Sequence, residues 1–510
     1  MENSMKKETL RMERVTYVEQ GLVCLDNFNM TIWEGEIFGL VPVNHYGLED
    51  LLRLLKQNLP LYYGYVYYQE HLINTWQKTA VRENRISIIQ NKSCLAEDLT
   101  VADNIFVLRS GFKQRVIQPR VLKQQLEPFL EEIGMDIPAD AYISELSPFE
   151  RFVVELLKAV VAGHHLIVLS DISTFISESE LIKLQEIIRY YSTKGFSFLY
   201  IAAHFEEARQ ICGRVALMLN GQIQKCFYQG DKTPDTFSLK GVKDFDQWVR
   251  QQQMSLAATK NAADAVLTMQ NVQYGYIQDL QLTISAGECV VLQDVDNSII
   301  GDFVKLMEGA APESGQFLLA GKKCKKGDRR IAVIQELPAQ TMVFSNLSYL
   351  DNLCFTMDHR AKGMWTLGGV KRSVMEEFGK QLGEEVFYGK VDDLNKRQKY
   401  DLIYTRILLQ NPRVVVCVQP FKNAEVSIRS HIWELIERFL KKGIAVVILA
   451  LNLADSLALA DKLVRIRDGK ADEIYEKKDF IKLPDSTPWL YLYQERYASK
   501  QKEENEREVW

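Results

Sequence analysis

Short apolar runs alternate with amphipathic stretches along the whole chain. Six runs are apolar throughout and lie at 37–41, 166–169, 198–202, 289–292, 414–417 and 445–450. Strands that are covered on both faces of a sheet show this pattern, whereas the amphipathic stretches between them are typical of surface helices. Strands that alternate with helices in this way predict an α/β fold with mainly parallel sheets.

The second half of the chain repeats the first. Three pairs of segments correspond, namely 30–36 with 282–288, 99–106 with 347–354, and 219–222 with 467–470. The offset is about 250 residues, far longer than the periods of solenoid repeats, so the repeated unit is a whole domain. We expect each unit to begin with two short strands, which form an antiparallel β edge, and to contain a helical middle section.

The repeat sets the expected domain boundaries. We place a first domain at 1–240, a linker at 241–264, a second domain at 265–485 and a tail at 486–510. The tail is almost wholly charged over 500–508, which is typical of a frayed chain end.

The order of these features resembles the double-cassette ATP-binding subunits of bacterial sugar importers, and the ribose and galactoside class most of all. The segments Asp98–Phe106 and Leu408–Pro412 are similar to that class in detail, and the resemblance covers nearly the whole chain. It implies two tandem ATP-binding-cassette domains of the P-loop NTPase type, with ATP and Mg²⁺ as ligands. It also implies a permease or another cassette subunit as partner, and a cytoplasmic location at the inner face of the membrane.

The phosphate loop of the first half departs from the family pattern. Such a loop needs glycines, whose backbone N–H groups close around phosphate, then a Lys for the phosphates and a Ser or Thr for Mg²⁺. Asn44 and Gly47 fit this pattern. The Lys and hydroxyl positions are taken by Leu48, Glu49 and Asp50. Like charges a few ångströms apart cost about 1 kcal/mol in water and more when shielded from it. We therefore expect an ordinary strand–turn–helix here.

The phosphate loop of the second half departs further. Ile300 stands at the Lys position, and the β-branched Ile299 replaces the glycine before it. Asp294 and Asp296 add negative charge that would repel a phosphate. We expect no phosphate binding of the family's kind at this loop.

The positions for the metal and the attacking water are also changed. The family ends its second buried strand with Asp-Glu, one for Mg²⁺ and one for the water. Here Ser170 and Asp171 stand at these positions in the first half, and Gln419 stands at the Glu position in the second. Asp171 is the remaining candidate general base. We favour a capping or surface role for it, since its metal and phosphate partners are missing.

The signature loops lack the family's glycines but read as helix starts. Ser147 is a predicted N-cap, Pro148 suits the first turn, and Glu150 completes a capping box. Asn395 and Gln398 form the same predicted device in the second half. The sequence therefore predicts that both helices are kept while the phosphate contact of Ser147 is lost.

Two further candidates complete the nucleotide-site residues. Ala203 stands at the family's switch-histidine position, and His204 follows one residue late, which turns its side chain to the other face of a strand end. A catalytic His204 stays open, although a surface or capping role is favoured. Tyr17 is a candidate for stacking on adenine, against core packing as the alternative.

The composition of the chain disfavours several classes of protein, including nucleic-acid-binding and membrane-spanning proteins. The chain is 47% hydrophobic and 25% charged with a net charge of −5, so no basic field favours nucleic acid. No apolar stretch is long enough for a membrane span, and the charged start 1–8 does not resemble a signal peptide. The eight cysteines form no CxxC pair, and we expect no metal site.

These observations favour a pseudo-ATPase, a cassette-shaped subunit that docks on a permease, another cassette or a regulatory protein. No bound cofactor is expected; ATP and Mg²⁺ enter only through the resemblance. The alternative is a divergent but active ATPase that energises sugar import, with Asp171, His204 and Tyr17 as its support. Use on ribosomes is disfavoured, because the chain is acidic and its linker is not basic.

Overall fold

The structure is a computed structural model that describes residues 7–90, 92–107, 118–228, 265–357, 364–383, 386–387, 389–453 and 455–483. The chain divides into two compact units, Met1–Phe237 and Ser238–Trp510. The proposed linker 241–264 and the tail 486–510 lie outside the described residues.

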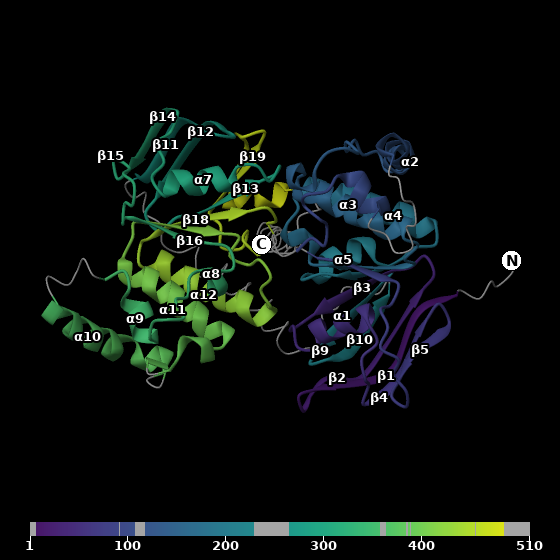
Figure 1. Cartoon of the computed structure of the whole chain (residues 1–510). Coiled ribbons are helices and arrows are strands. Elements are labelled where there is room, and N and C mark those ends of the chain that lie inside the picture. The colour runs from purple at the N-terminus through teal and green to yellow at the C-terminus, as the bar shows by residue number, and fades with distance from the viewer. Residues whose placement is uncertain are drawn as a thin grey trace, which may run out of the picture. The chain divides into compact units, whose positions relative to one another are not determined.

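The first unit is built on a six-stranded sheet in the order β10-β9-β3-β8-β7-β6 (Figure 1). Its strands are β3 (Ile37–Pro42), β6 (Ile86–Ile89), β7 (Leu166–Ser170), β8 (Ser197–Ile201), β9 (Arg214–Leu219) and β10 (Gln222–Tyr228). All neighbours pair in parallel except β9 and β10. The fully buried central strands are the apolar runs of the sequence, which confirms the predicted parallel sheet.

A second, antiparallel sheet in the order β2-β1-β4-β5 completes the first unit. Its strands are β1 (Glu8–Glu19), β2 (Leu22–Trp33), β4 (Tyr63–Tyr68) and β5 (His71–Thr75). The helices of this unit are α1 (Leu48–Lys56), α2 (Pro119–Glu132), α3 (Pro148–Val161), α4 (Glu178–Thr193) and α5 (Phe205–Ile211), with shorter turns at Asp103–Val107, Ile143–Glu145 and Ile172–Thr174. The antiparallel β edge expected from the sequence is therefore present.

The second unit has the same topology. Its large sheet, in the order β16-β17-β18-β13-β19-β20, consists of β13 (Cys289–Asp294), β16 (Ile331–Ile334), β17 (Val414–Val418), β18 (Ala445–Ala450), β19 (Lys462–Arg467) and β20 (Lys470–Glu476). Its antiparallel sheet, in the order β12-β11-β14-β15, consists of β11 (Ala265–Tyr274), β12 (Ile277–Ser285), β14 (Ser314–Leu319) and β15 (Lys322–Lys323). The duplication read from the sequence is thus a duplication of strand order.

The helices of the second unit lie on both faces of its large sheet. They are α7 (Ile300–Met307), α8 (Pro338–Thr341), α9 (Tyr349–Cys354), α10 (Met364–Leu382), α11 (Lys396–Gln410) and α12 (Val426–Lys441), with short turns at Val391–Asp393 and Lys477–Lys482. Figure 1 shows α7 between the two sheets of its unit, where Phe303 and Leu306 pack in one core with residues of both sheets.

The first helix of each unit begins earlier than the sequence indicated. The apolar pattern of the sequence predicts helices at 51–57 and 303–308, whereas α1 begins at Leu48 and α7 at Ile300. The apolar residues at the two Lys positions explain the difference. Leu48 is buried in the core between the sheets, and Ile300 packs against the equivalent core. Burying such a side chain is worth about 1.5–3 kcal/mol, which favours helix at these positions.

Candidate functional site

The candidate nucleotide sites lie at the carboxyl ends of β3 and β13. In the first unit, β3 pairs with β8 on one side and with β9 on the other. In the second unit, β13 pairs in the same way with β18 and β19. Ligands of open α/β sheets bind where the strand order reverses in this way. The loops after β3 and β13 are therefore the places where a phosphate would sit.

The loop after β3 is tied to its own unit by side-chain contacts. The Asn44 amide donates to Asn220 Oδ1 at 2.7 Å, and its own oxygen accepts the Asn220 backbone N–H at 3.2 Å. Tyr46 donates its hydroxyl to the Val23 carbonyl at 2.8 Å. The two residues thus hold the loop against the β9–β10 turn and strand β2.

Gly47 is required by the close approach of two backbones. Its φ of 76° is in the left-handed region, and a Cβ added to it would lie 2.2 Å from the Cys24 carbonyl oxygen. The same Cβ would lie 3.1 Å from Gly221 Cα. The close approach of strand β2 and of the β9–β10 turn therefore requires a glycine at position 47, independently of any contact with phosphate.

The residues after Gly47 do not face a ligand together. Leu48 is 5% exposed and belongs to the core. Asp50 lies 3.3 Å from Arg53, which also pairs with Glu19. Glu49 is exposed in the first helical turn. The acidic pair thus serves the helix N-terminus, as expected from the helix dipole, without a side-chain cap.

In the loop after β13 an internal carboxylate occupies the amide cradle. Asp294 is 1% exposed, and its Oδ2 accepts the backbone N–H groups of Ile299 at 2.7 Å and Ile300 at 3.1 Å. Burial raises the pKa of this carboxyl, while the backbone hydrogen bonds lower it. The sequence marked Asp294 as a source of repulsion toward phosphate. The structure shows it bound where a phosphate oxygen would be bound.

The two loops share one further contact. The Asp296 carboxylate accepts the backbone N–H of Asp468 at 2.6 Å, just as Asn44 accepts that of Asn220 in the first unit. Both acceptors tie the loop after the central strand to the turn that precedes the last strand of the sheet. This pair of contacts is a structural feature of the repeat.

The end of β7 brings together Ser170 and Asp171. Asp171 has a left-handed backbone with φ 53°, and its N–H donates to the Ile201 carbonyl at 3.0 Å. It stands at the N-cap of the short turn Ile172–Thr174, but its side chain makes no cap hydrogen bond. Thr174 instead donates its hydroxyl to the Asp171 carbonyl at 2.7 Å. The proposed capping role of Asp171 therefore rests on the position of its backbone at the start of the turn Ile172–Thr174.

The equivalent position in the second unit, Gln419, is held by a polar network. Its φ is 42° and its N–H donates to the Leu449 carbonyl at 2.9 Å, which matches the geometry of Asp171. The Gln419 amide donates to Glu336 Oε1 at 2.7 Å, and Lys422 donates to Glu336 Oε2 at 2.8 Å. Glu336 follows β16. Its carboxylate thus has both oxygens bound within the protein.

His204 stands at the N-cap of α5 and is 9% exposed. Next to it, and not recognised from the sequence, Glu207 is 2% exposed and accepts the Tyr200 hydroxyl at 2.6 Å and the Ser173 hydroxyl at 2.7 Å. Burial raises the pKa of Glu207, although both hydrogen bonds and the charge of His204 act against this. The alternation of apolar residues in the sequence gave no sign of a buried acid one helical turn from His204.

Tyr17 is 6% exposed, with its ring in the core of the first unit and its hydroxyl donating to Glu19 at 3.1 Å. A ring packed in this way presents little surface, which favours core packing, and stacking of Tyr17 on adenine stays a prediction.

Both signature-like segments are capped helix starts, as predicted. The Ser147 hydroxyl accepts the Glu150 N–H at 3.2 Å, and the Glu150 carboxylate accepts the Ser147 N–H at 2.8 Å. Asn395 and Gln398 form the same reciprocal pair at 2.9 and 3.0 Å. Ser147 therefore already has a hydrogen-bond partner within its own helix.

Two buried asparagines explain why one sequence segment is kept in both halves. Asn104 and Asn352 are both 0% exposed. Each accepts a backbone N–H and donates to several carbonyls of the preceding loop, with Ala96 as the first partner of Asn104 and Phe344 as the first partner of Asn352. These side chains shape the loops that lead into the turn Asp103–Val107 and into α9. Both asparagines are turned inward, so the repeated segment is needed for packing.

None of the helices in the described ranges has the length and apolar content that crossing a bilayer requires. In the part of the chain that the structure describes, no three His, Cys, Asp or Glu side chains gather as a metal ion would need.

Known proteins resemble this chain over most of its length. Residues 25–172 match the family model described as ABC transporter. A putative ribose/galactose/methyl galactoside import ATP-binding protein of Hahella chejuensis is 23% identical over 482 residues, which cover 91% of this chain and 92% of that protein. The ribose import ATP-binding protein RbsA of Caldanaerobacter subterraneus subsp. tengcongensis is 21% identical and is covered to 98% of its length.

A solved structure shares the fold. The protein titled RNase-L Inhibitor aligns with a TM-score of 0.60 at 13% identity and covers 92% of this chain. Together with the duplicated strand order, this likeness shows two tandem ATP-binding-cassette domains with mainly parallel sheets and antiparallel β edges.

Proposed function

We propose that this chain is a cassette subunit of a carbohydrate import system that acts by docking or regulation and does not hydrolyse ATP. The sugar-import setting rests on relatives whose names describe ribose and galactoside import ATP-binding proteins and whose length this chain covers almost completely. The pseudo-ATPase character rests on the chemistry of the two loops.

One observation carries the proposal: the amide cradle after β13 is filled by the chain's own carboxylate. Asp294 binds the N–H groups of Ile299 and Ile300. For a triphosphate to take these amides it would have to displace a buried acid that is covalently part of the loop. A group held at the site by the chain competes at a high effective concentration, which weakens any external anion.

The loop after β3 supports the same conclusion by a different route. The position that needs a cation holds Leu48, and withdrawing this side chain from the core would cost about 1.5–3 kcal/mol. Asp50 and Glu49 follow at the helix N-terminus, where they satisfy the dipole that would otherwise attract phosphate.

The partner we propose is a membrane permease or another cassette subunit of a sugar importer. Through such a partner the protein would lie at the inner face of the cell membrane, without inserting into it. A nucleic-acid partner is disfavoured, since the net charge of −5 repels a polyphosphate backbone.

The competing function is a divergent ATPase that energises sugar import. The relatives are named as ATP-binding proteins, and Asp171 and His204 still follow the buried strands β7 and β8. In that case a general base would have to work without the family's metal carboxylate, because Ser170 stands in its place.

Titration calorimetry with Mg-ATP on the full chain separates the two functions. The docking function predicts no saturable heat at ligand concentrations up to about 1 mM, a range that would detect any affinity of physiological use. A bound Mg-nucleotide with measurable phosphate release would establish the ATPase instead.

A pull-down tests the partner. The chain is coexpressed with the permease genes that neighbour its own gene, and the membrane fraction is examined for the complex. Recovery with the permease, independent of added nucleotide, is the expected result. A chain that stays alone and monomeric with these permeases, and with neighbouring cassette subunits, would contradict docking.

A further inference from the structure

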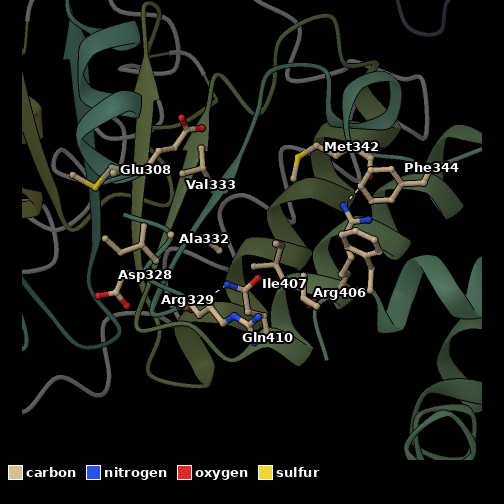
Figure 2. Close-up of a pocket in the computed structure, with 15 residues that line it drawn as sticks. Glu308, Asp328, Arg329, Ala332, Val333, Met342, Phe344, Arg406, Ile407 and Gln410 are labelled. Carbon is tan, nitrogen blue, oxygen red and sulfur yellow. Dashed lines mark hydrogen bonds between the residues drawn. The ribbon is translucent and has the colours of Figure 1, made fainter. Parts of the chain in front are cut away.

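A pocket of about 700 Å³ opens in the second unit (Figure 2). It lies between β16 with the loop before it, the end of α7, the residues on either side of α9, and the C-terminal half of α11. Sites for small organic ligands commonly have volumes of 300–1,000 Å³. Its walls are mostly apolar and include Ile331, Ala332, Val333 and Ile407. The position is separate from the loop after β13 that holds Asp294.

A buried cation lines this apolar pocket. Arg406 is 3% exposed and points from α11 toward Phe344 and Met342 in Figure 2. Its Nη2 donates to the Met342 carbonyl at 2.7 Å. Its Nη1 is buried and has no hydrogen-bond acceptor among the described residues. A buried N–H without an acceptor costs about 1–3 kcal/mol, and more when the group is charged.

The charge of Arg406 has no compensating acid in the described residues around it. Burial lowers the pKa of Arg406 to about 10, and no carboxylate contributes to this shift. The side chain is therefore still a cation at pH 7. Two acids line the pocket. Asp328 is paired with Arg330 at 2.6 Å, and Glu308 accepts a hydrogen bond from Gln335 Nε2 at 3.3 Å.

Two exposed aromatic rings stand beside this cation. Phe344 and Phe355 are 39% and 55% exposed, and their ring centroids lie 4.7 Å apart. The Arg406 guanidinium lies 5.3 Å from the Phe344 ring. Exposed rings can rotate without disturbing a core, so Phe344 and Phe355 can adjust to a ligand beside Arg406.

We propose that this pocket binds an organic carboxylate with an apolar body. The carboxylate accepts from Arg406 Nη1, and the apolar body lies against Phe344, Phe355 and the aliphatic wall. The anion supplies the acceptor and the countercharge that the buried guanidinium lacks, through a charge-assisted hydrogen bond. The apolar body distinguishes such a ligand from phosphate, which would gain nothing from the walls. This inference is independent of whether the phosphate loops bind nucleotide.

Calorimetry on the full chain with octanoate and phenylbutyrate tests the site, with octanamide and phenylbutyramide as neutral analogues and inorganic phosphate as an anion without an apolar body. We expect the carboxylates to bind at least about 10-fold more tightly than their amides, equivalent to 1.4 kcal/mol. Phosphate should produce no saturable heat. Equal binding of acid and amide, binding of phosphate as tight as that of the acids, or no binding of either acid would overturn the proposal.

Variants assign the binding to the pocket. Arg406→Met should abolish carboxylate binding, while Arg372→Met, on the exposed surface of α10 in the same unit, should leave it unchanged. Phe344→Ala changes an exposed ring, so it should fold even if Arg406→Met does not. It should weaken both acids several-fold and keep their preference over the amides. Carboxylate binding by Arg406→Met as tight as by the wild type, or binding that Phe344→Ala leaves unchanged, would place the recognition elsewhere.

Discussion

The carboxylate of Asp294 accepts the backbone N–H of Ile299 at 2.7 Å and is almost inaccessible to water. A loop of the kind that binds phosphate in other α/β proteins thus closes on an acid from its own strand. The consequence is mutual: the amides have an acceptor in the free protein, and the acid is held away from solvent. This relationship can be tested without any nucleotide.

Asp294→Ala should lower the free energy of unfolding by about 1–3 kcal/mol, because the N–H groups of Ile299 and Ile300 lose their acceptor. The cost of burying the acid offsets part of this loss. Urea denaturation measures the change. Added inorganic phosphate should restore part of the variant's stability and leave the wild type unchanged, since only the variant has free amides.

Asp296→Ala is the matched control in the same loop. Its carboxylate is exposed and accepts a single N–H, from Asp468. We expect a loss below about 0.5 kcal/mol, as for surface substitutions in general. An Asp294→Ala protein as stable as the wild type would show that the internal carboxylate does not support the loop.

Gly47→Ala should destabilise the first unit by about 2 kcal/mol or more. The left-handed backbone alone costs an alanine about 1 kcal/mol, and the added Cβ would meet the Cys24 carbonyl oxygen at 2.2 Å. Gly134→Ala provides the comparison, since Gly134 has φ 63° and nothing within 4 Å of the added Cβ. Thermal unfolding of both variants measures the difference. Equal losses would mean that the close backbone approach has no cost of its own.

Gln419→Glu tests whether the second unit merely lacks a catalytic base. The new carboxylate would lie where the amide now donates to Glu336, so two like charges would meet at hydrogen-bond distance. We expect a loss of about 1–2 kcal/mol at neutral pH and no phosphate release from Mg-ATP. Lys422 moderates the repulsion but is already bound to Glu336.

The double variant Gln419→Glu with Glu336→Gln should recover most of this stability, since it restores a donor opposite an acceptor. Urea denaturation of the four proteins of this cycle gives the coupling between the two positions. A stable Gln419→Glu protein that hydrolyses ATP would contradict both the network and the proposed function.

Much of the fold could be predicted from the sequence, because strands buried on both faces leave uninterrupted apolar runs, as in Val414–Val418. The helix caps at Ser147 and Asn395 were also predictable, since a capping box depends on residue types within four consecutive positions. Such local hydrogen bonds can be predicted without knowing which residues lie nearby in the folded protein.

The site could be predicted only in part. That Leu48 and Ile300 replace a cation is visible in the sequence, but the place of the Asp294 side chain depends on how the loop closes over it. The network of Gln419, Glu336 and Lys422 joins residues far apart in the chain, and no periodicity connects them. Glu207 was missed for the same reason, because its partner Ser173 comes from a different strand end.

Glu207 predicts how stability depends on pH. Burial raises its pKa above the usual 4.5, so the folded protein keeps this proton at pH values where the unfolded chain has lost it. Its contribution to stability is therefore greatest below the unfolded value and decreases as pH rises toward the folded value. Glu207→Gln removes this titration.

The difference in unfolding free energy between wild type and Glu207→Gln should shrink as the pH rises above the usual value of 4.5. Urea denaturation at a series of pH values measures it, and Glu206→Gln next to it in the chain is the control variant. A difference that grows with pH would show that the ionised form of Glu207 is the one that the fold stabilises.

The two buried asparagines offer a reason why the same segment occurs in both halves of the chain. Asn104 and Asn352 hold the backbone of Ala96 and Phe344, and either loss would leave buried peptide groups unsatisfied. Selection for foldability alone is enough to retain both, whether or not a nucleotide ever binds. The likeness of the two halves in this segment is thus a requirement of loop packing, and it carries no information about catalysis.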